Sequence, residues 1–206
     1  MSVQKSIRKK FKDSFEIKCL KLFVSAYKSA IKNNSVKIDL EENDITAELN
    51  RYISENPLRL EWQIHTNVEH HLPKNDTQKT KGFSAKFARI DLRFSNFVSA
   101  FEHIYFIEAK NIEQKGLKGS QLKRRYINTG IDNFTSKKYE NGCLVGYLLK
   151  GNLELTVEGI NSLLKKDKRD AEFLNFKKSD LHDFYYESEH IEIGILKHFI
   201  FDFTEK

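Results

Sequence analysis

Two short segments of the sequence place carboxylates inside apolar runs. The segment "FARIDLRF" (residues 87–94) carries Asp91, and the segment "YFIEAK" (residues 105–110) carries Glu108 and Lys110. Both segments have the composition of buried strands. An ionised carboxylate in apolar surroundings is costly unless it is paired or bound to a metal ion. These residues are therefore the first candidates for a chemical site.

The spacing of these residues brings their charges together in a sheet. Successive side chains of a strand point to opposite faces, so Glu108 and Lys110 share one face. If the two strands form a hairpin, a register centred near residues 99–100 sets Asp91 opposite Glu108, with Cβ atoms about 5 Å apart. Two carboxylates at that distance repel each other unless a cation lies between them.

A divalent ion with oxygen ligands, Mg²⁺ or Mn²⁺, resolves that repulsion. Such an ion can activate a bound water as a nucleophile and offset the charge that builds on a phosphate. Lys110 can then orient or deprotonate that water and stabilise the transition state. The residues predict phosphodiester hydrolysis, with Asp91 and Glu108 as metal ligands. The alternative is an internal pair, Asp91 with an arginine or Glu108 with Lys110, that only holds the sheet together.

Apolar periodicity predicts helices and strands that alternate along the chain. The expected helices cover residues 3–33, about 43–56, 119–139 and about 152–166. The expected strands cover residues 60–72, 85–94, 103–112, 142–149, 181–188 and 195–203. We expect a single α/β domain over residues 1–206, with a central mixed sheet flanked by helices.

The second expected helix supplies a further acid. Glu48 lies beside the apolar stripe of this helix, three residues after Ile45, so it can point toward the surface on which the helix packs. Glu41, Glu42 and Asp44 compete with it for that role, and a solvated helix edge is the alternative. We expect Glu48 to be an accessory metal ligand or a water-orienting residue.

This pattern resembles the PD-(D/E)XK, or restriction-endonuclease-like, nuclease superfamily. The family signature is an acid on one core strand, an E/D-x-K triplet on the next, and often a glutamate from a preceding helix. Here it falls on Asp91, on Glu108 with Lys110, and on Glu48. The order of elements also matches the family core over about residues 43–149, with an N-terminal helical extension and a C-terminal β-hairpin outside it. "RID" stands where many members have a proline-aspartate pair.

The resemblance implies an Mg²⁺-dependent (or Mn²⁺-dependent) endonuclease that cleaves DNA, with RNA as an alternative substrate, in restriction or phage defence. The family also includes inactive modules that bind nucleic acid or protein, and nuclease subunits that a partner activates. A homodimer and a larger defence-system protein are the partner classes left open. The absence of a Walker-type glycine loop from the sequence favours the partner-activated role.

Other side chains near the expected site are candidates for substrate contact. Cations along the helix after the E-x-K strand can neutralise phosphates without reading sequence, although a solvated helix face is the alternative. These cations are Lys118, Lys123, Arg124 and Arg125. The accessory candidates are Gln121 and Tyr126, where some relatives carry a glutamine and a tyrosine; Arg89 and Arg93, on the face of Asp91; and His190 near the cleft. Packing on the sheet is the alternative for Tyr126.

Composition sets outer bounds on the function. The net charge is +6 with a pI near 9.1, and the basic residues concentrate in residues 1–37 and 111–138. This distribution favours a nucleic-acid partner. No apolar run is long enough to cross a bilayer and no secretory segment is evident, so a cytoplasmic location is expected. Cys19 and Cys143 stand far apart and predict neither a disulfide framework nor a cysteine zinc site.

Overall fold

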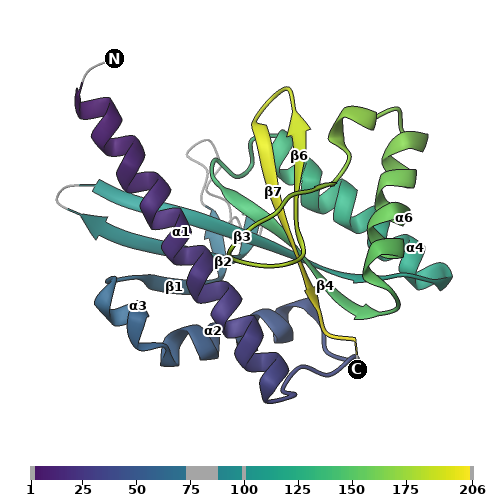
Figure 1. Ribbon diagram of the computed structural model, residues 1–206, viewed down its shortest axis with the longest axis horizontal. Coiled ribbons are helices and arrows are strands. Elements are labelled where there is room, and N and C mark those ends of the chain that lie inside the picture. The colour runs from purple at the N-terminus through teal and green to yellow at the C-terminus, as the bar shows by residue number, and fades with distance from the viewer. Residues whose placement is uncertain (1–2, 73–87, 99–100, 205–206) are drawn as a thin grey trace, which may run out of the picture.

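The computed structural model describes residues 3–72, 88–98 and 101–204. A seven-stranded mixed sheet runs through the molecule in the order β1-β2-β3-β4-β7-β6-β5 (Figure 1). The strands are β1 (His65–Leu72), β2 (Ala88–Val98), β3 (Phe101–Glu113), β4 (Gly142–Lys150), β5 (Asn175–Phe176), β6 (Tyr185–His190) and β7 (Gly194–Asp202). The central strands β3, β4 and β7 are parallel, and the other neighbours are antiparallel. The predicted α/β class with a mixed sheet is confirmed.

Helices cover both faces of the sheet. They are α1 (Val3–Lys32), α2 (Glu42–Glu55), α3 (Pro57–Glu61), α4 (Gly116–Arg125), the π-helical turn η2 (Tyr126–Ile131), α5 (Asp132–Thr135), α6 (Leu153–Lys166) and the 3₁₀ turn η3 (Asp170–Glu172). On one face α1 crosses the sheet diagonally (Figure 1), and it shares one apolar core with α2. On the other face η2, α5 and α6 enclose a second core. Within the described residues, no helix has the length and apolar character needed to span a bilayer.

The second helix forms where the sequence predicts it. Glu41 and Asp44 make reciprocal capping bonds that start α2, and Ile45, Leu49 and Ile53 are fully buried along its inner face. The residue before Pro57 is disfavoured in helical geometry, so α2 ends there. The entire apolar stripe of α2 is therefore fixed against the sheet.

Three details differ from the sequence-based expectation. Residues 60–72 are not one strand, because Pro57 opens the short helix α3 and the Asn56 side chain caps it by accepting the Leu58 N–H at 3.0 Å. The single helix expected over residues 119–139 is broken into α4, η2 and α5. The short strand β5 was not indicated by alternation. The loop expected at residues 73–82 and the start of the expected second strand lie outside the described residues.

The β2–β3 hairpin has the predicted register. Cross-strand pairs run from Val98 with Phe101 to Leu92 with Ile107. One further step along this register brings Asp91 beside Glu108, just beyond the last of these pairs. The pairing of β2 with β3 thus ends just before the two acids.

The parallel strands align a second set of residues with Glu108. Glu108 on β3 pairs with Leu144 on β4, and Leu144 pairs with His198 on β7. Paired residues of neighbouring strands project to the same face, so these three side chains form one row. This face is the one that η2, α5 and α6 cover.

Candidate active site

Four charged side chains meet where β2 and β3 separate, and we call Glu42, Asp91, Glu108 and Lys110 the acid cluster. Lys110 Nζ lies 2.8 Å from Glu108 Oε1, 3.1 Å from Glu42 Oε1 and 3.8 Å from Asp91 Oδ2. It also donates to the backbone carbonyl of Ala109 at 2.5 Å. The four side chains are between 6% and 15% exposed, so one cationic atom is shared by three nearly buried carboxylates.

The backbone explains why the sheet accepts carboxylates here. Alternate N–H groups of β3 face β2, and they lose their ladder partners where β2 turns away. The N–H of Ala109 donates instead to Asp91 Oδ2 at 2.6 Å, and the N–H of Asn111 donates to Glu42 Oε2 at 2.9 Å. Two side-chain carboxylates therefore continue the hydrogen bonding of the ladder beyond its last backbone pair.

Glu108 is held from its other side by the segment that follows α4. The Tyr139 hydroxyl lies 2.9 Å from Glu108 Oε2 and 2.9 Å from the carbonyl oxygen of Arg89. Asn133 Nδ2 donates to Glu108 Oε1 at 3.3 Å. The Tyr139 ring is buried edge-on against Phe134, with ring centroids 5.2 Å apart. Tyr139 thus links β2, β3 and the helical layer at the acid cluster.

Burial and neighbouring charges shift the pKa values of Asp91 and Lys110. Burial and then the charge of Glu108 raise the pKa of Asp91 to about 7, although Lys110 and the Ala109 N–H act in the opposite direction. Burial by itself would lower the pKa of Lys110, but Glu108, Asp91 and Glu42 outweigh it and raise that pKa above its usual value. The cluster therefore favours an added positive charge, because negative charge exceeds positive when all three acids ionise.

The donor set fits a small hard cation. No group of three or more His, Cys, Asp and Glu residues is arranged to hold a metal ion in the part of the chain that the structure describes. Mg²⁺, however, commonly uses one or two carboxylates and retains several waters. Asp91 and Glu108 supply two such carboxylates, and nitrogen or sulfur ligands suited to zinc are absent from the acid cluster. The chemistry of the residues fits Mg²⁺ or Mn²⁺.

The structure does not bring Glu48 to this site. Glu48 accepts two hydrogen bonds from Arg51, at 2.7 and 2.9 Å, and this pairing lowers its pKa. The apolar stripe of α2 packs over the sheet, and only the first turn of the helix reaches the end of the β2–β3 ladder. Glu42, one of the competing acids, stands at that first turn. The helix glutamate of the cluster is therefore Glu42, and the expectation for Glu48 is corrected.

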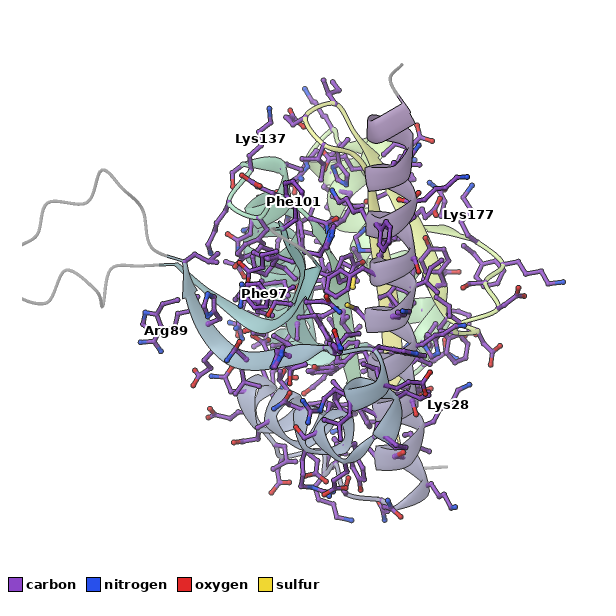
Figure 2. The ribbon with its side chains drawn as sticks, turned by 90° about the vertical axis from the view of Figure 1, so that its left-hand side faces the viewer. Lys28, Arg89, Phe97, Phe101, Lys137 and Lys177 are labelled. Carbon is purple, nitrogen blue, oxygen red and sulfur yellow. The ribbon has the colours of Figure 1, made fainter. Side chains whose placement is uncertain are left out.

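The two arginines of β2 do not pair with Asp91. The side chain of Arg89 is 54% exposed and points outward from the molecule (Figure 2), with Glu69 at 3.8 Å. Arg93 bonds to Glu102 and donates to Ser95 Oγ at 3.3 Å. Lys110 and the Ala109 N–H are the groups that contact the Asp91 carboxylate instead.

The four cations expected to contact phosphate have different environments. Lys123 is buried and donates to the carbonyls of residues 113 and 114, at 3.0 and 2.6 Å, which removes it as a surface contact. Arg124 is bonded to Asp167. Lys118 is mostly exposed beside Glu113. Arg125 is 55% exposed and lies 3.6 Å from Glu42 Oε1, which makes it the one of these four beside the acid cluster.

Two accessory candidates belong to a separate buried network, and we call Tyr126, His198, Ser188 and His190 the histidine chain. The Tyr126 hydroxyl lies 2.9 Å from His198 Nδ1, and Ser188 Oγ lies 2.7 Å from His198 Nε2 and 2.6 Å from His190 Nε2. His190 Nδ1 is 2.9 Å from Glu172 Oε2, without the geometry of a hydrogen bond. Burial lowers the pKa of His198 to about 3. Gln121, the remaining candidate, is exposed on α4.

Sequence reasoning did not single out Tyr139 and Asn133. Asn133 lies in α5 and Tyr139 follows it, and both fall within the single helix expected over residues 119–139. One signal was available for Tyr139: it comes just before β4, the strand that pairs in parallel with β3. A residue just before β4 lies next to the part of β3 that pairs with the beginning of β4. Glu108 is in that part of β3.

Comparisons of this chain with models of known protein families, with curated proteins and with solved structures find no match. The geometry of the acid cluster and the order of the strands therefore carry the functional argument.

Proposed function

We propose that this protein is a metal-dependent nuclease with a restriction-endonuclease-like core, acting on DNA in the cytoplasm. One observation supports this most directly. Asp91, Glu108, Lys110 and Glu42, from two strands and a helix, converge at the end of the β2–β3 ladder, where Lys110 Nζ lies 2.8 Å from Glu108, 3.1 Å from Glu42 and 3.8 Å from Asp91. A buried carboxylate with a raised pKa beside a lysine, as Asp91 has here, is typical of catalytic sites.

In this proposal Asp91 and Glu108 hold Mg²⁺ or Mn²⁺. The ion would supply an activated water and charge stabilisation on the phosphate. Lys110 keeps its proton because its pKa is raised, so Nζ donates to the developing negative charge and is a poor general base. Glu42 orients Nζ from the helix side, at 3.1 Å.

The substrate contacts follow from the exposed cations near the cluster. Arg125 and Lys118 lie on the helix that follows β3, and both side chains are more than half exposed. Such cations bind the phosphate backbone without reading its sequence. DNA is proposed from the family resemblance, and RNA serves as the comparison substrate in the test.

The test is cleavage of plasmid DNA, linear duplex and RNA by the purified protein in Mg²⁺, in Mn²⁺ and in a chelator. We expect metal-dependent cleavage that Lys110→Ala lowers by about 10²- to 10⁴-fold. Lys177→Ala is the matched control, since it removes an exposed lysine next to the edge strand β5, outside the cluster, and should leave the rate nearly unchanged. An absence of metal-dependent cleavage, or undiminished cleavage by Lys110→Ala, would contradict the proposal.

A second candidate function is a binding module that keeps the fold without catalysis. It is favoured by the ion pairs of Lys110 with all three carboxylates, which could also serve only to stabilise the sheet. This candidate predicts nucleic-acid or protein binding and no heat of Mn²⁺ binding. A nuclease subunit that a partner protein activates would bind Mn²⁺ and cleave DNA only when that partner is added.

A further inference from the structure

The two oxygens of the Glu108 carboxylate have different neighbours. Oε1 faces the acid cluster, where Lys110 Nζ donates to it at 2.8 Å, and it also accepts from Asn133 Nδ2 at 3.3 Å. Oε2 faces the other way, toward the Tyr139 hydroxyl at 2.9 Å. Glu108 is 4% exposed, so water does not replace these partners freely. Of the two oxygens of Glu108, it is therefore Oε1 that shares the ammonium of Lys110 with Glu42 and Asp91 and that would bind a cation there.

Tyr139 is itself fixed in place. Its hydroxyl lies 2.9 Å from the backbone carbonyl of Arg89 on β2, and its ring packs against Phe134 and Phe106 with centroids 5.2 and 6.1 Å away. The side chain is 2% exposed. The hydroxyl carries one hydrogen, which it donates either to the Arg89 carbonyl or to Glu108 Oε2. When Glu108 receives it, Glu108 cannot rotate to present both oxygens without breaking that bond.

We propose that Tyr139 is a positioning residue that holds Glu108 as a one-oxygen ligand and thereby sets which divalent ion the acid cluster prefers. Mg²⁺ and Mn²⁺ take six ligands in octahedral geometry, which suits single carboxylate oxygens and waters. Ca²⁺ takes six to eight oxygens and readily accepts both oxygens of one carboxylate. A carboxylate restricted to one oxygen favours the smaller ions. This inference rests on the proposed metal-dependent function.

The experiment is calorimetric titration of Mn²⁺ and of Ca²⁺ into the full chain without nucleic acid. Tyr139→Phe keeps the ring and removes the hydroxyl, and Tyr126→Phe removes an equally buried hydroxyl that contacts His198 instead. Loss of a hydrogen-bond partner behind a metal ligand typically weakens metal binding by about 10- to 100-fold. We expect that loss for Mn²⁺ in Tyr139→Phe and a smaller loss or a gain for Ca²⁺.

The preference between the two ions is the decisive readout, because a general loss of structure would weaken both. We expect the ratio of the Ca²⁺ and Mn²⁺ dissociation constants to fall about 10-fold in Tyr139→Phe and to stay unchanged in Tyr126→Phe. Tyr139→His, whose ring retains an N–H donor, provides a second variant and should give an intermediate ratio. An unchanged ratio in both Tyr139 variants would overturn the inference. Absence of Mn²⁺ binding by the unsubstituted protein would instead overturn the proposed function itself, and this inference with it.

Discussion

The acid cluster and the histidine chain are two polar groups buried on one face of the same sheet. Glu108 and His198 even share a row across the strands, separated by Leu144. In the histidine chain Tyr126, His198 and Ser188 are fully buried and bonded to one another, and His190 Nδ1 at its end lies beside Glu172. The acid cluster is charged and lies at the end of a ladder, beside the exposed Arg125.

The difference lies in how each group meets the cost of burial. Neutral hydroxyls and imidazoles that hydrogen-bond to one another offset most of the free energy that their burial costs. We therefore infer that the histidine chain stabilises the fold. Three carboxylates around one lysine remain strained, as the raised pKa of Asp91 indicates. Charged groups kept together at such a cost are candidates for chemistry.

The largest expected effect distinguishes Glu108 from His198, the two ends of the row that crosses β3, β4 and β7. Glu108→Gln should lower metal-dependent cleavage by at least about 10³-fold while leaving stability equal or higher, because it removes a charge that repels Asp91. His198→Gln should lower the free energy of unfolding by about 1–3 kcal/mol, through unsatisfied buried partners, with little change in the activity of folded molecules. Cleavage assays and urea unfolding measure both. The reverse pattern would contradict the assignment of chemistry to the acid cluster.

A second pair of variants tests which glutamate of α2 belongs to the acid cluster. Glu42→Gln should lower cleavage by about 10- to 100-fold, since it weakens the contact that orients Lys110. Glu48→Gln is the control on the same helix and should not change the rate, because its partner is Arg51. Equal losses in the two variants would show that helix stability, and not the cluster, is being measured.

The two regions should respond to pH in opposite directions. Native Asp91 keeps its proton up to a pKa of about 7, whereas the unfolded residue releases it near 4, so raising the pH between these values lowers stability. Native His198 stays neutral down to a pKa of about 3, whereas the unfolded residue takes up a proton near 6.5. Lowering the pH through that window therefore also lowers stability. Tyr126, Ser188 and His190 face His198 in the native state.

This opposition can be measured by urea unfolding between pH 4.5 and 6.5 in a chelator. Asp91→Asn should make stability rise more steeply with pH, and His198→Gln should flatten or reverse that rise. Each change in slope should be at most about 1.4 kcal/mol per pH unit, the value for one proton. Identical slopes in both variants and the unsubstituted protein would mean that neither group titrates as described.

The smallest expected effect concerns Arg124 and Arg125, two neighbouring cations at the end of α4. Arg125→Ala should reduce the salt dependence of DNA binding by about one phosphate contact, because Arg125 is exposed beside the acid cluster. Arg124→Ala should change it less, because Asp167 already holds that guanidinium. Binding measured over a range of salt concentrations distinguishes the two. A larger effect for Arg124 would place the nucleic-acid surface nearer α6.

The sequence predicts the charged centre of the site because strands obey simple rules. The alternation of side chains along a strand puts Glu108 and Lys110 on one face. The short connection between the two strands leaves few pairing registers in which Asp91 would lie far from Glu108. Helical periodicity is weaker evidence, because it identifies the inner face of α2 but not which turn reaches the end of a strand. Glu48 and Glu42 could not be separated on that basis.

Residues fixed by tertiary packing were beyond sequence reasoning. The sequence predicts Lys123 to be a surface cation on a helix, yet its ammonium donates to the carbonyls of residues 113 and 114 at the end of β3. Tyr139 is the last residue of the helix expected over residues 119–139, yet it contacts the cluster because β4 lies parallel beside β3. Such contacts depend on how distant elements come together, which local composition does not encode.

The carboxylates that continue the β2–β3 ladder also make two backbone amides sensitive to events at the site, which NMR spectroscopy can detect. The amide protons of Ala109 and Asn111 are bonded directly to Asp91 and Glu42. Any ion or substrate that draws on those carboxylates must alter the two amide resonances and their exchange with solvent. An event at the site can therefore be followed from the protein backbone alone, without labelled nucleic acid and before any bond is cleaved.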